Sequence, residues 1–238
     1  MHPFIYEFLG TAVLILFGNG VVANVVLDKS KGHNSGWIVI AFGWAMAVFL
    51  GVMVSMKGSG GHLNPVVTLS MAYLGRLSWS EVPVYFAGQM LGAMTGSLLV
   101  YFTYKRHFDT TENAEAKLAC FCTHPAIRSP FYNFLTEVIA TFGLMIGVLF
   151  IAAPATAMGS IEALPVAFLV LGVGLSLGGS TGYAVNPARD LGPRMMHFLL
   201  PVKDKGKSDW AYAWIPVLGP VMGGLLATWA YHVILNNF

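Results

Sequence analysis

Six apolar stretches, each long enough to cross a lipid bilayer, constrain the fold of this chain more than any other feature. A helix needs about 20 apolar residues to span the hydrocarbon core. Hydrophobic residues make up 56% of the chain and charged residues only 10%, whereas soluble domains carry roughly 25% charged residues. The predicted spans cover residues 4–26, 37–56, 82–104, 131–152, 161–177 and 211–235. We therefore expect an all-α membrane protein with six transmembrane helices.

Two shorter apolar segments remain, and both begin with Asn-Pro. They are NPVVTLSMAYLG, which starts at Asn64, and NPARDLGPRMMHFLL, which starts at Asn186. Proline favours the first position of a helix, but helices this short cannot cross a bilayer. Irregular backbone at membrane depth is tolerated only where it is buried in protein or lines a wet cavity. We therefore expect two re-entrant half-helices whose N-termini meet in the bilayer centre.

The two halves of the chain also resemble each other. YEFLGTAVLILFG in the first half is similar to TEVIATFGLMIG in the second, with Glu7 matching Glu137. Each half holds three spans, an odd number, so the second half must be inverted relative to the first. Inverted repeats with broken helices place their site near the midplane. We expect a single domain over residues 1–238, built from repeats of about 1–115 and 130–238.

The charge and the cysteines argue against several other classes of protein. A net charge of +2 is too small to indicate a nucleic-acid partner. The two cysteines, Cys120 and Cys122, have His124 nearby, but a zinc site needs more ligands. We expect two ordinary loop thiols, with no metal and no cofactor. The N-terminus has no basic region and no cleavage-site pattern, so the first apolar run is predicted to be a span rather than a signal peptide.

The motifs SGGHLNPVVT and TGYAVNPARD, together with six spans and duplicated halves, resemble the major intrinsic protein family of aquaporins and glycerol facilitators. The resemblance covers nearly the whole chain. Asp190, directly after the Arg of the second motif, resembles the glycerol-conducting branch rather than the water-only branch. An aquaporin-like fold, a homotetramer and a plasma-membrane location with cytoplasmic termini are what this resemblance implies.

The same resemblance implies a selectivity filter formed by four residues, Trp44, Gly174, Tyr183 and Arg189. Water-selective relatives usually have histidine where Gly174 stands, so glycine is expected to leave room for a carbon chain. Tyr183 stands where glycerol facilitators more often have phenylalanine. Val66 replaces the usual alanine and is expected to add bulk near the midplane. The residues of the two motifs are Asn64, Pro65, Val66, Asn186, Pro187 and Ala188.

The two stretches before the Asn-Pro motifs are expected to be extended, so that their carbonyls form a ladder of acceptors along one wall of a pore. Each half-helix N-terminus carries about +0.5 of an elementary charge, which together with Arg189 would repel cations. Intramembrane acids are candidates for function. We expect Glu7 and Glu137, with Asp190, to support the broken loops, with a proton relay as the alternative. The ladder residues are Gly60, Gly61, His62, Leu63, Gly182, Tyr183, Ala184 and Val185.

We predict a passive channel that conducts glycerol and other small uncharged solutes, with water, and that excludes ions and protons. Urea, dihydroxyacetone, lactic acid and hydrogen peroxide are further candidate solutes. The alternative is a secondary active transporter built on inverted repeats, for which Glu7 and Glu137 are the candidate acids. An intramembrane hydrolase is a third reading, but neither Ser59 nor Ser180 has a placed histidine base.

Loop charges oppose the orientation that the resemblance implies. Positive residues normally gather on the cytoplasmic side, yet the loops on the side of the termini hold only Lys57 and Arg76. We give precedence to the family placement, because long loops count for less in this rule. The opposite loops hold Lys29, Lys31, Lys105, Arg106, Lys117, Arg128, Arg194, Lys203, Lys205 and Lys207.

Overall fold

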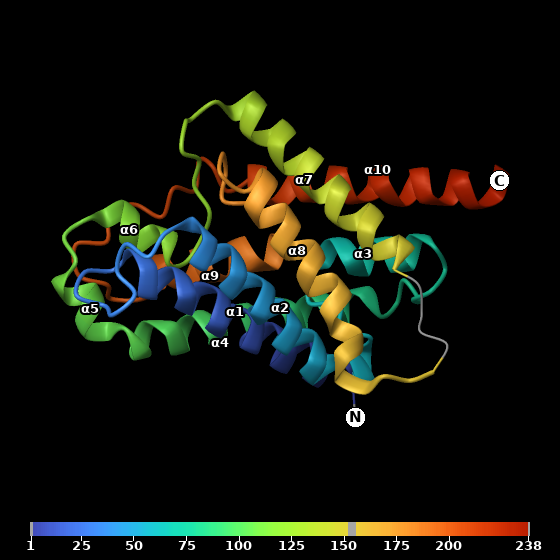
Figure 1. The fold of residues 1–238 in the computed structure, drawn as a ribbon, viewed down its shortest axis with the longest axis horizontal. Helices are drawn as coiled ribbons and strands as arrows, with labels where there is room; N and C mark the ends of the chain where they lie inside the picture. Colours follow the sequence, from blue (N-terminus) through green and yellow to red (C-terminus); the bar gives the residue numbers. More distant parts are fainter. Residues whose placement is uncertain (1, 152–155, 238) are drawn as a thin grey trace.

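A computed structural model describes residues 2–151 and 156–237, and the regular elements in this part of the chain are all helices (Figure 1). Ala152, the last residue of the fourth predicted span, lies outside the described residues. In chain order the elements are α1 (Pro3–Val26), α2 (Trp37–Ser59), α3 (Pro65–Tyr73), α4 (Val82–Thr103), α5 (Lys105–Thr110), α6 (Ala114–Ala119), α7 (Pro130–Phe150), η1 (Gly159–Ala163), α8 (Leu164–Leu177), α9 (Pro187–Leu199) and α10 (Ile215–Asn237).

Helix length separates the spanning helices from the half-helices. Five helical stretches, which are α1, α2, α7, η1 with α8, and α10, are long and apolar enough to cross a membrane. Helix α4 has 22 residues, which at about 1.5 Å per residue gives roughly 33 Å, and it contains no Asp, Glu, Lys or Arg. Helices α3 and α9 have only 9 and 13 residues. The structure therefore has the expected series of six long helices and two short ones.

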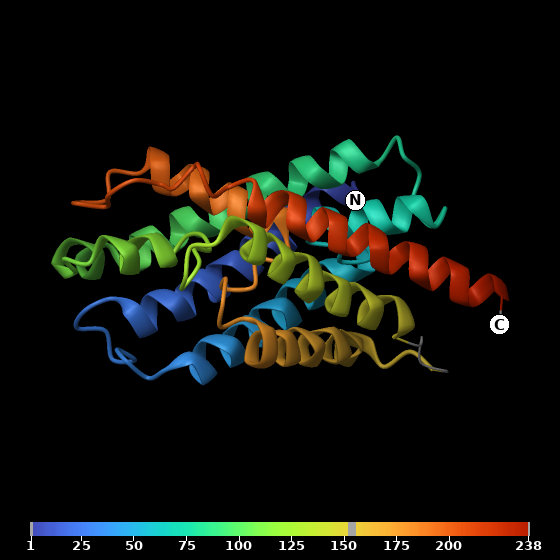
Figure 2. The same cartoon turned by 90° about the horizontal axis from the view of Figure 1, so that it is seen from above.

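Glycines allow the long helices to pack closely in two groups. Helix α1 packs against α2 and α4, and α7 packs against α8 and α10 (Figures 1 and 2). A Cβ atom on Gly92 of α4 would lie 2.4 Å from the Phe8 carbonyl oxygen of α1. A Cβ atom on Gly223 of α10 would lie 2.2 Å from the Val138 carbonyl oxygen of α7. Small residues at these positions let the helix backbones pack closely. Close packing matters in lipid, where the hydrophobic effect does not drive helices together.

The half-helices lie in opposite halves of the molecule. Helix α3 lies in the half that also holds both termini, whereas α9 lies toward the half with α5 and α6 (Figures 1 and 2). Each begins with proline at its first position and with asparagine as its N-cap. Because both N-caps are buried, the two helix starts lie inside the protein rather than at its surface.

The segment between α4 and α7 differs from the polar loop expected over residues 105–129. It contains the short helices α5 and α6. Two of its aromatic side chains, Phe108 and Phe121, are completely buried in the main hydrophobic cluster, whereas Ile127 is exposed. Cys120 and Cys122 are also buried and carry free thiols, and burial raises the pKa of both. The segment therefore packs as part of the core and forms one wall of the site described below.

Candidate pore and selectivity site

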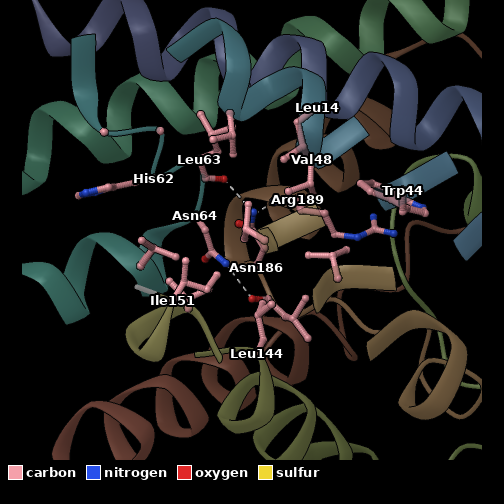
Figure 3. Close-up of a pocket in the computed structure, with 18 of the residues that line it drawn as sticks. Leu14, Trp44, Val48, His62, Leu63, Asn64, Leu144, Ile151, Asn186 and Arg189 are labelled. Carbon is pink, nitrogen blue, oxygen red and sulfur yellow. Dashed lines mark hydrogen bonds between the residues drawn. The ribbon is translucent and has the colours of Figure 1, made fainter. Parts of the chain in front are cut away.

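Asn64 and Asn186 face each other at the centre of a cavity and bind the opposite loops (Figure 3). The Asn64 Nδ2 amide donates to the Val185 carbonyl at 2.9 Å, and the Asn186 Nδ2 amide donates to the Leu63 carbonyl at 2.8 Å. Each Nδ2 carries two hydrogens, and each of these two reciprocal bonds uses only one of them. One N–H on each side chain is therefore left over. The two half-helix starts therefore meet, and each presents one amide hydrogen to the cavity between them.

The side-chain oxygens of the same asparagines cap the half-helices. Asn64 Oδ1 accepts from the Val66 amide at 2.9 Å. Asn186 Oδ1 accepts from the amides of Ala188 and Arg189 at 3.0 and 3.3 Å. A cap of this kind fixes the side chain relative to the helix start, and the amide nitrogen then has to point away from the helix toward the opposite loop. The same side-chain orientation therefore caps the half-helix with Oδ1 and directs Nδ2 toward the opposite loop.

The loops before the two asparagines are not extended as the sequence analysis expected. Gly60, Gly61 and Leu63 have φ of 82°, 67° and 52°, and Tyr183 and Val185 have φ of 38° and 44°. Left-handed backbone is unfavourable for a β-branched residue such as Val185. It places the carbonyls of Leu63 and Val185 where the opposite asparagines bind them. The irregular backbone is thus coupled to the contact between the half-helices.

Glu7 and Glu137 hold these two loops in equivalent ways. Glu7 accepts from the backbone amides of His62 and Leu63 at 3.0 and 2.8 Å. Glu137 accepts from those of Ala184 and Val185, both at 3.0 Å. Hydroxyls add a further donor to each carboxylate, Ser59 to Glu7 at 2.5 Å and Thr181 to Glu137 at 2.6 Å. Both acids are almost completely buried and neither lines the cavity.

Two cavities follow one another along the molecule. The first, of ≈430 Å³, contains the asparagine pair and is lined on its apolar side by residues of α1, α2, α7 and α8 such as Leu14, Val48, Leu144 and Val170. The second, of ≈300 Å³, opens toward the segment between α4 and α7, where it is lined by Cys122, Thr123 and His124. Seven of the eight ladder residues line the first cavity and Gly182 lines the second. Both loops therefore form part of the wall of one path.

Three residues line both cavities, and they are Trp44, Tyr183 and Arg189. The Arg189 guanidinium lies 4.0 Å from the centre of the Trp44 ring (Figure 3). Arg189 is mostly buried, and its Nη1 has no hydrogen-bond partner within the described part of the protein. Burial lowers the pKa of His124, which leaves Arg189 as the permanent positive charge at this boundary. The cavities meet at an aromatic pair and a cation with a free donor.

Gly174, the fourth predicted filter residue, lies behind Tyr183 and lines neither cavity. A Cβ atom on Gly174 would lie 3.0 Å from both Cζ and Oη of Tyr183. The space that glycine leaves is therefore filled by the tyrosine ring rather than by open volume. The Tyr183 hydroxyl is buried without a hydrogen-bond partner among the described residues. Because this hydroxyl is buried, Tyr183 lines the path with other atoms than its Oη.

The bulk that Val66 was expected to add near the midplane does not line the path. Val66 is buried but lines neither cavity, and its neighbour Val67 lines the first cavity instead. The Val66 side chain packs against α10, where a Cβ atom on Gly224 would lie only 2.0 Å from a Val66 methyl carbon. Glycine at position 224 accommodates the larger side chain. Pro65, Pro187 and Ala188 are likewise buried beside the path without lining it.

Asp190 supports α9 through an ion pair that the sequence analysis did not identify. It binds Arg194 one turn later, with Nε to Oδ1 at 2.8 Å, and both side chains are fully buried. Arg194 is therefore not a loop charge, as its assignment to the outer loops had implied. Asp190 Oδ2 also accepts from the amide and the hydroxyl of Thr123 at 2.8 and 2.6 Å. The pair ties α9 to the wall of the second cavity.

Sequence reasoning missed two further residues that contact the site. Gln89 of α4 donates to Glu7 Oε2 at 2.8 Å and to the Thr68 hydroxyl at 2.9 Å. Trp37 of α2 donates to the Gly174 carbonyl at 2.9 Å and packs on Tyr183. The position of Gln89, a polar residue inside an apolar span, was a usable signal. Trp37 is one aromatic residue among many and lies at a helix start, and the sequence contained no signal that singled it out.

Comparison with known proteins agrees with this geometry. A family model described as "Major intrinsic protein" matches residues 1–231. A probable glycerol uptake facilitator protein of Thermotoga maritima is 53% identical over 232 residues, covering 98% of this chain and 99% of the relative. A glycerol uptake facilitator protein of Streptococcus pneumoniae is 50% identical over 233 residues, again covering 98% and 99%. The X-ray structure of the aquaglyceroporin from Plasmodium falciparum superposes with a TM-score of 0.84 at 33% identity, covering 96% of this chain and 93% of that one. The chain belongs to the major intrinsic protein family, a family of channels rather than enzymes.

Proposed function

We propose that this chain is a passive channel that conducts glycerol, with water and other small uncharged solutes, across the cell membrane. The observation that carries the proposal is the pair of adjacent cavities: the first contains the asparagine pair, and both are lined by Trp44, Tyr183 and Arg189. Glycerol as the solute is supported by relatives that are glycerol uptake facilitators. They are about 50% identical to this chain over nearly their whole length.

The chemistry of the walls suits a polyol. Arg189 and the two asparagine amides offer donors to hydroxyl oxygens, and the loop carbonyls offer acceptors to hydroxyl hydrogens. The carbon chain of the solute can lie against the rings of Trp44 and Tyr183 and against the aliphatic side chains opposite the loops. A solute therefore exchanges its hydrogen bonds with water for hydrogen bonds with the wall, and no covalent step is needed.

Ions are opposed by the charge of the same groups. Two helix N-termini, each equivalent to about +0.5 of an elementary charge, point at the path together with Arg189. A cation or hydronium would also have to lose its hydration beside Arg189, where the two cavities meet. The asparagine amides donate to a water oxygen from both sides, which leaves its hydrogens pointing outward and interrupts a proton-conducting chain.

The transporter alternative requires a coupling-ion site, for which Glu7 and Glu137 were the candidates. Each carboxylate accepts two backbone amides and at least one side-chain donor, and neither reaches a cavity. No group of three or more His, Cys, Asp or Glu side chains that could hold a metal ion is present among the described residues. Glu7 and Glu137 are better understood as supports for the loops than as an ion or proton site.

We further propose that residues 1–115 and 130–238 form an inverted repeat within one domain, since Glu7 and Glu137, the two N-caps and the two loops form equivalent contacts. We also propose a homotetramer with cytoplasmic termini, and membership of the family supports this.

The test is light scattering on vesicles that contain the purified protein. After a hyperosmotic glycerol step, the vesicles should shrink and then reswell far faster than empty vesicles, and the uptake should end at equal concentrations inside and outside. Reswelling no faster than that of empty vesicles would refute a glycerol channel. Accumulation of glycerol above its external concentration in the presence of an ion gradient would instead establish a transporter.

A further inference from the structure

Tyr183 forms one side of the constriction, yet the backbone does little to fix its position. It lies in a loop with left-handed φ, and its hydroxyl has no hydrogen-bond partner among the described residues. The placement of its ring therefore depends on packing. Behind the ring lie two glycines of α8 or its C-cap: a Cβ atom would lie 3.0 Å from Tyr183 Cζ at Gly174 and 2.4 Å from Cδ1 at Gly178. The Tyr183 ring therefore packs directly against the helix backbone at these two glycines.

Trp37, the first residue of α2, closes the outer side of this arrangement. Its ring meets the Tyr183 ring edge to face, with centroids 5.8 Å apart and an interplanar angle of 77°. Its Nε1 donates to the Gly174 carbonyl at 2.9 Å. Gly174 lies in the last turn of α8, where carbonyls have no partner further along the helix. One side chain thus fixes both the tyrosine and the surface behind it.

We propose that Trp37 is a positioning residue that sets the width of the constriction by holding the Tyr183 ring against α8. Trp37 lines the second cavity but not the first, so it lies on the outer side of Tyr183. Without its ring, Tyr183 can move away from the path into the vacated volume. The constriction widens, and solutes longer or bulkier than glycerol pass more readily. This inference rests on the proposed channel function.

The test compares reswelling rates for glycerol and for the five-carbon polyol xylitol in vesicles with equal protein content. Trp37→Ala should raise the ratio of the xylitol rate to the glycerol rate about 10-fold. This is the lower end of the discrimination that one extra methylene group produces in a hydrophobic pocket. Trp37→Phe retains a ring and should restore most of the discrimination. Gly174→Ala should lower the ratio, because its methyl group pushes the tyrosine into the path. Trp214→Ala, which removes a half-exposed tryptophan that stacks on Phe134 instead, is the matched control.

A loss of stability alone would lower both fluxes together and leave their ratio unchanged. A wild-type ratio in Trp37→Ala would therefore overturn the proposal. If that variant does not insert into vesicles, Trp37→Leu, which retains apolar bulk but loses both contacts, takes its place with the same expected rise. Failure of the wild-type protein to conduct glycerol would be a different result, because it would refute the channel function itself.

Discussion

Replacing Glu137 by leucine should disconnect the second loop from its support. The carboxylate accepts the amides of Ala184 and Val185, each at 3.0 Å, and the Thr181 hydroxyl at 2.6 Å. Leucine offers no acceptor, and the site is too deeply buried for water to replace one freely. The two amides are then left unsatisfied next to a valine in left-handed backbone.

The size of the effect follows from these contacts. A buried donor without a partner costs about 1–3 kcal/mol, so two amides cost about 2–6 kcal/mol. This is a large share of a typical free energy of unfolding of about 5–15 kcal/mol. Glu137→Gln can keep an acceptor oxygen at the Oε1 position, where Thr181 and Ala184 donate, and then loses only the Val185 amide. One unsatisfied amide costs about 1–3 kcal/mol.

Glycerol conduction should fall more in Glu137→Leu than in Glu137→Gln. The Val185 carbonyl is the acceptor for Asn64, so a displaced loop also releases the asparagine that contacts the solute. The measurements are thermal unfolding in detergent and glycerol reswelling per molecule of inserted protein, with Glu112→Gln at an exposed acid as the control. If Glu137→Leu unfolded at the wild-type temperature and conducted normally, the proposed supporting role of this carboxylate would be refuted.

Three further substitutions test other parts of the site. Asn186→Ala removes a helix cap, worth about 0.5–2 kcal/mol, and one pore donor, so stability and glycerol flux should both fall; normal flux would show that the amide does not contact the solute. Val66→Ala should cost about 1–2.5 kcal/mol in thermal unfolding because it removes buried methyl groups, while the ratio of glycerol to urea flux stays unchanged; a shifted ratio would place Val66 at the pore after all. Gly174→His must displace Tyr183, whose ring lies 3.0 Å from the position of its Cβ, so both water and glycerol flux should fall in stopped-flow scattering. Glycerol flux equal to wild type would show that Tyr183 does not narrow the path.

The sequence was sufficient to predict the membrane fold, because spans and half-helices depend on length, polarity and proline position. Six long helices and two short ones begin and end close to the predicted residues. The match of Glu7 with Glu137 also indicated that two buried acids would face two loops, and the hydrogen bonds between them are present. These features depend on local patterns or on an internal repeat, both of which can be read from one chain.

The details that the sequence could not supply depend on contacts between distant segments. The direction in which Val66 points is decided by Gly224, 158 residues later. The space beside Gly174 is decided by the ring of Tyr183, and the position of that ring by Trp37. The left-handed backbone before each asparagine arises because the carbonyls must reach the opposite loop, which a local expectation of extended chain does not include.

The most direct test of the account measures glycerol and proton movement in the same vesicles. With a pH gradient and a glycerol gradient imposed together, the protein should speed glycerol entry well above the rate of empty vesicles, while an internal pH dye reports decay of the pH gradient at the empty-vesicle rate. Decay of the pH gradient that accelerates with the amount of protein would contradict the claim that two opposed half-helix N-termini and Arg189 pass neutral solutes and exclude protons.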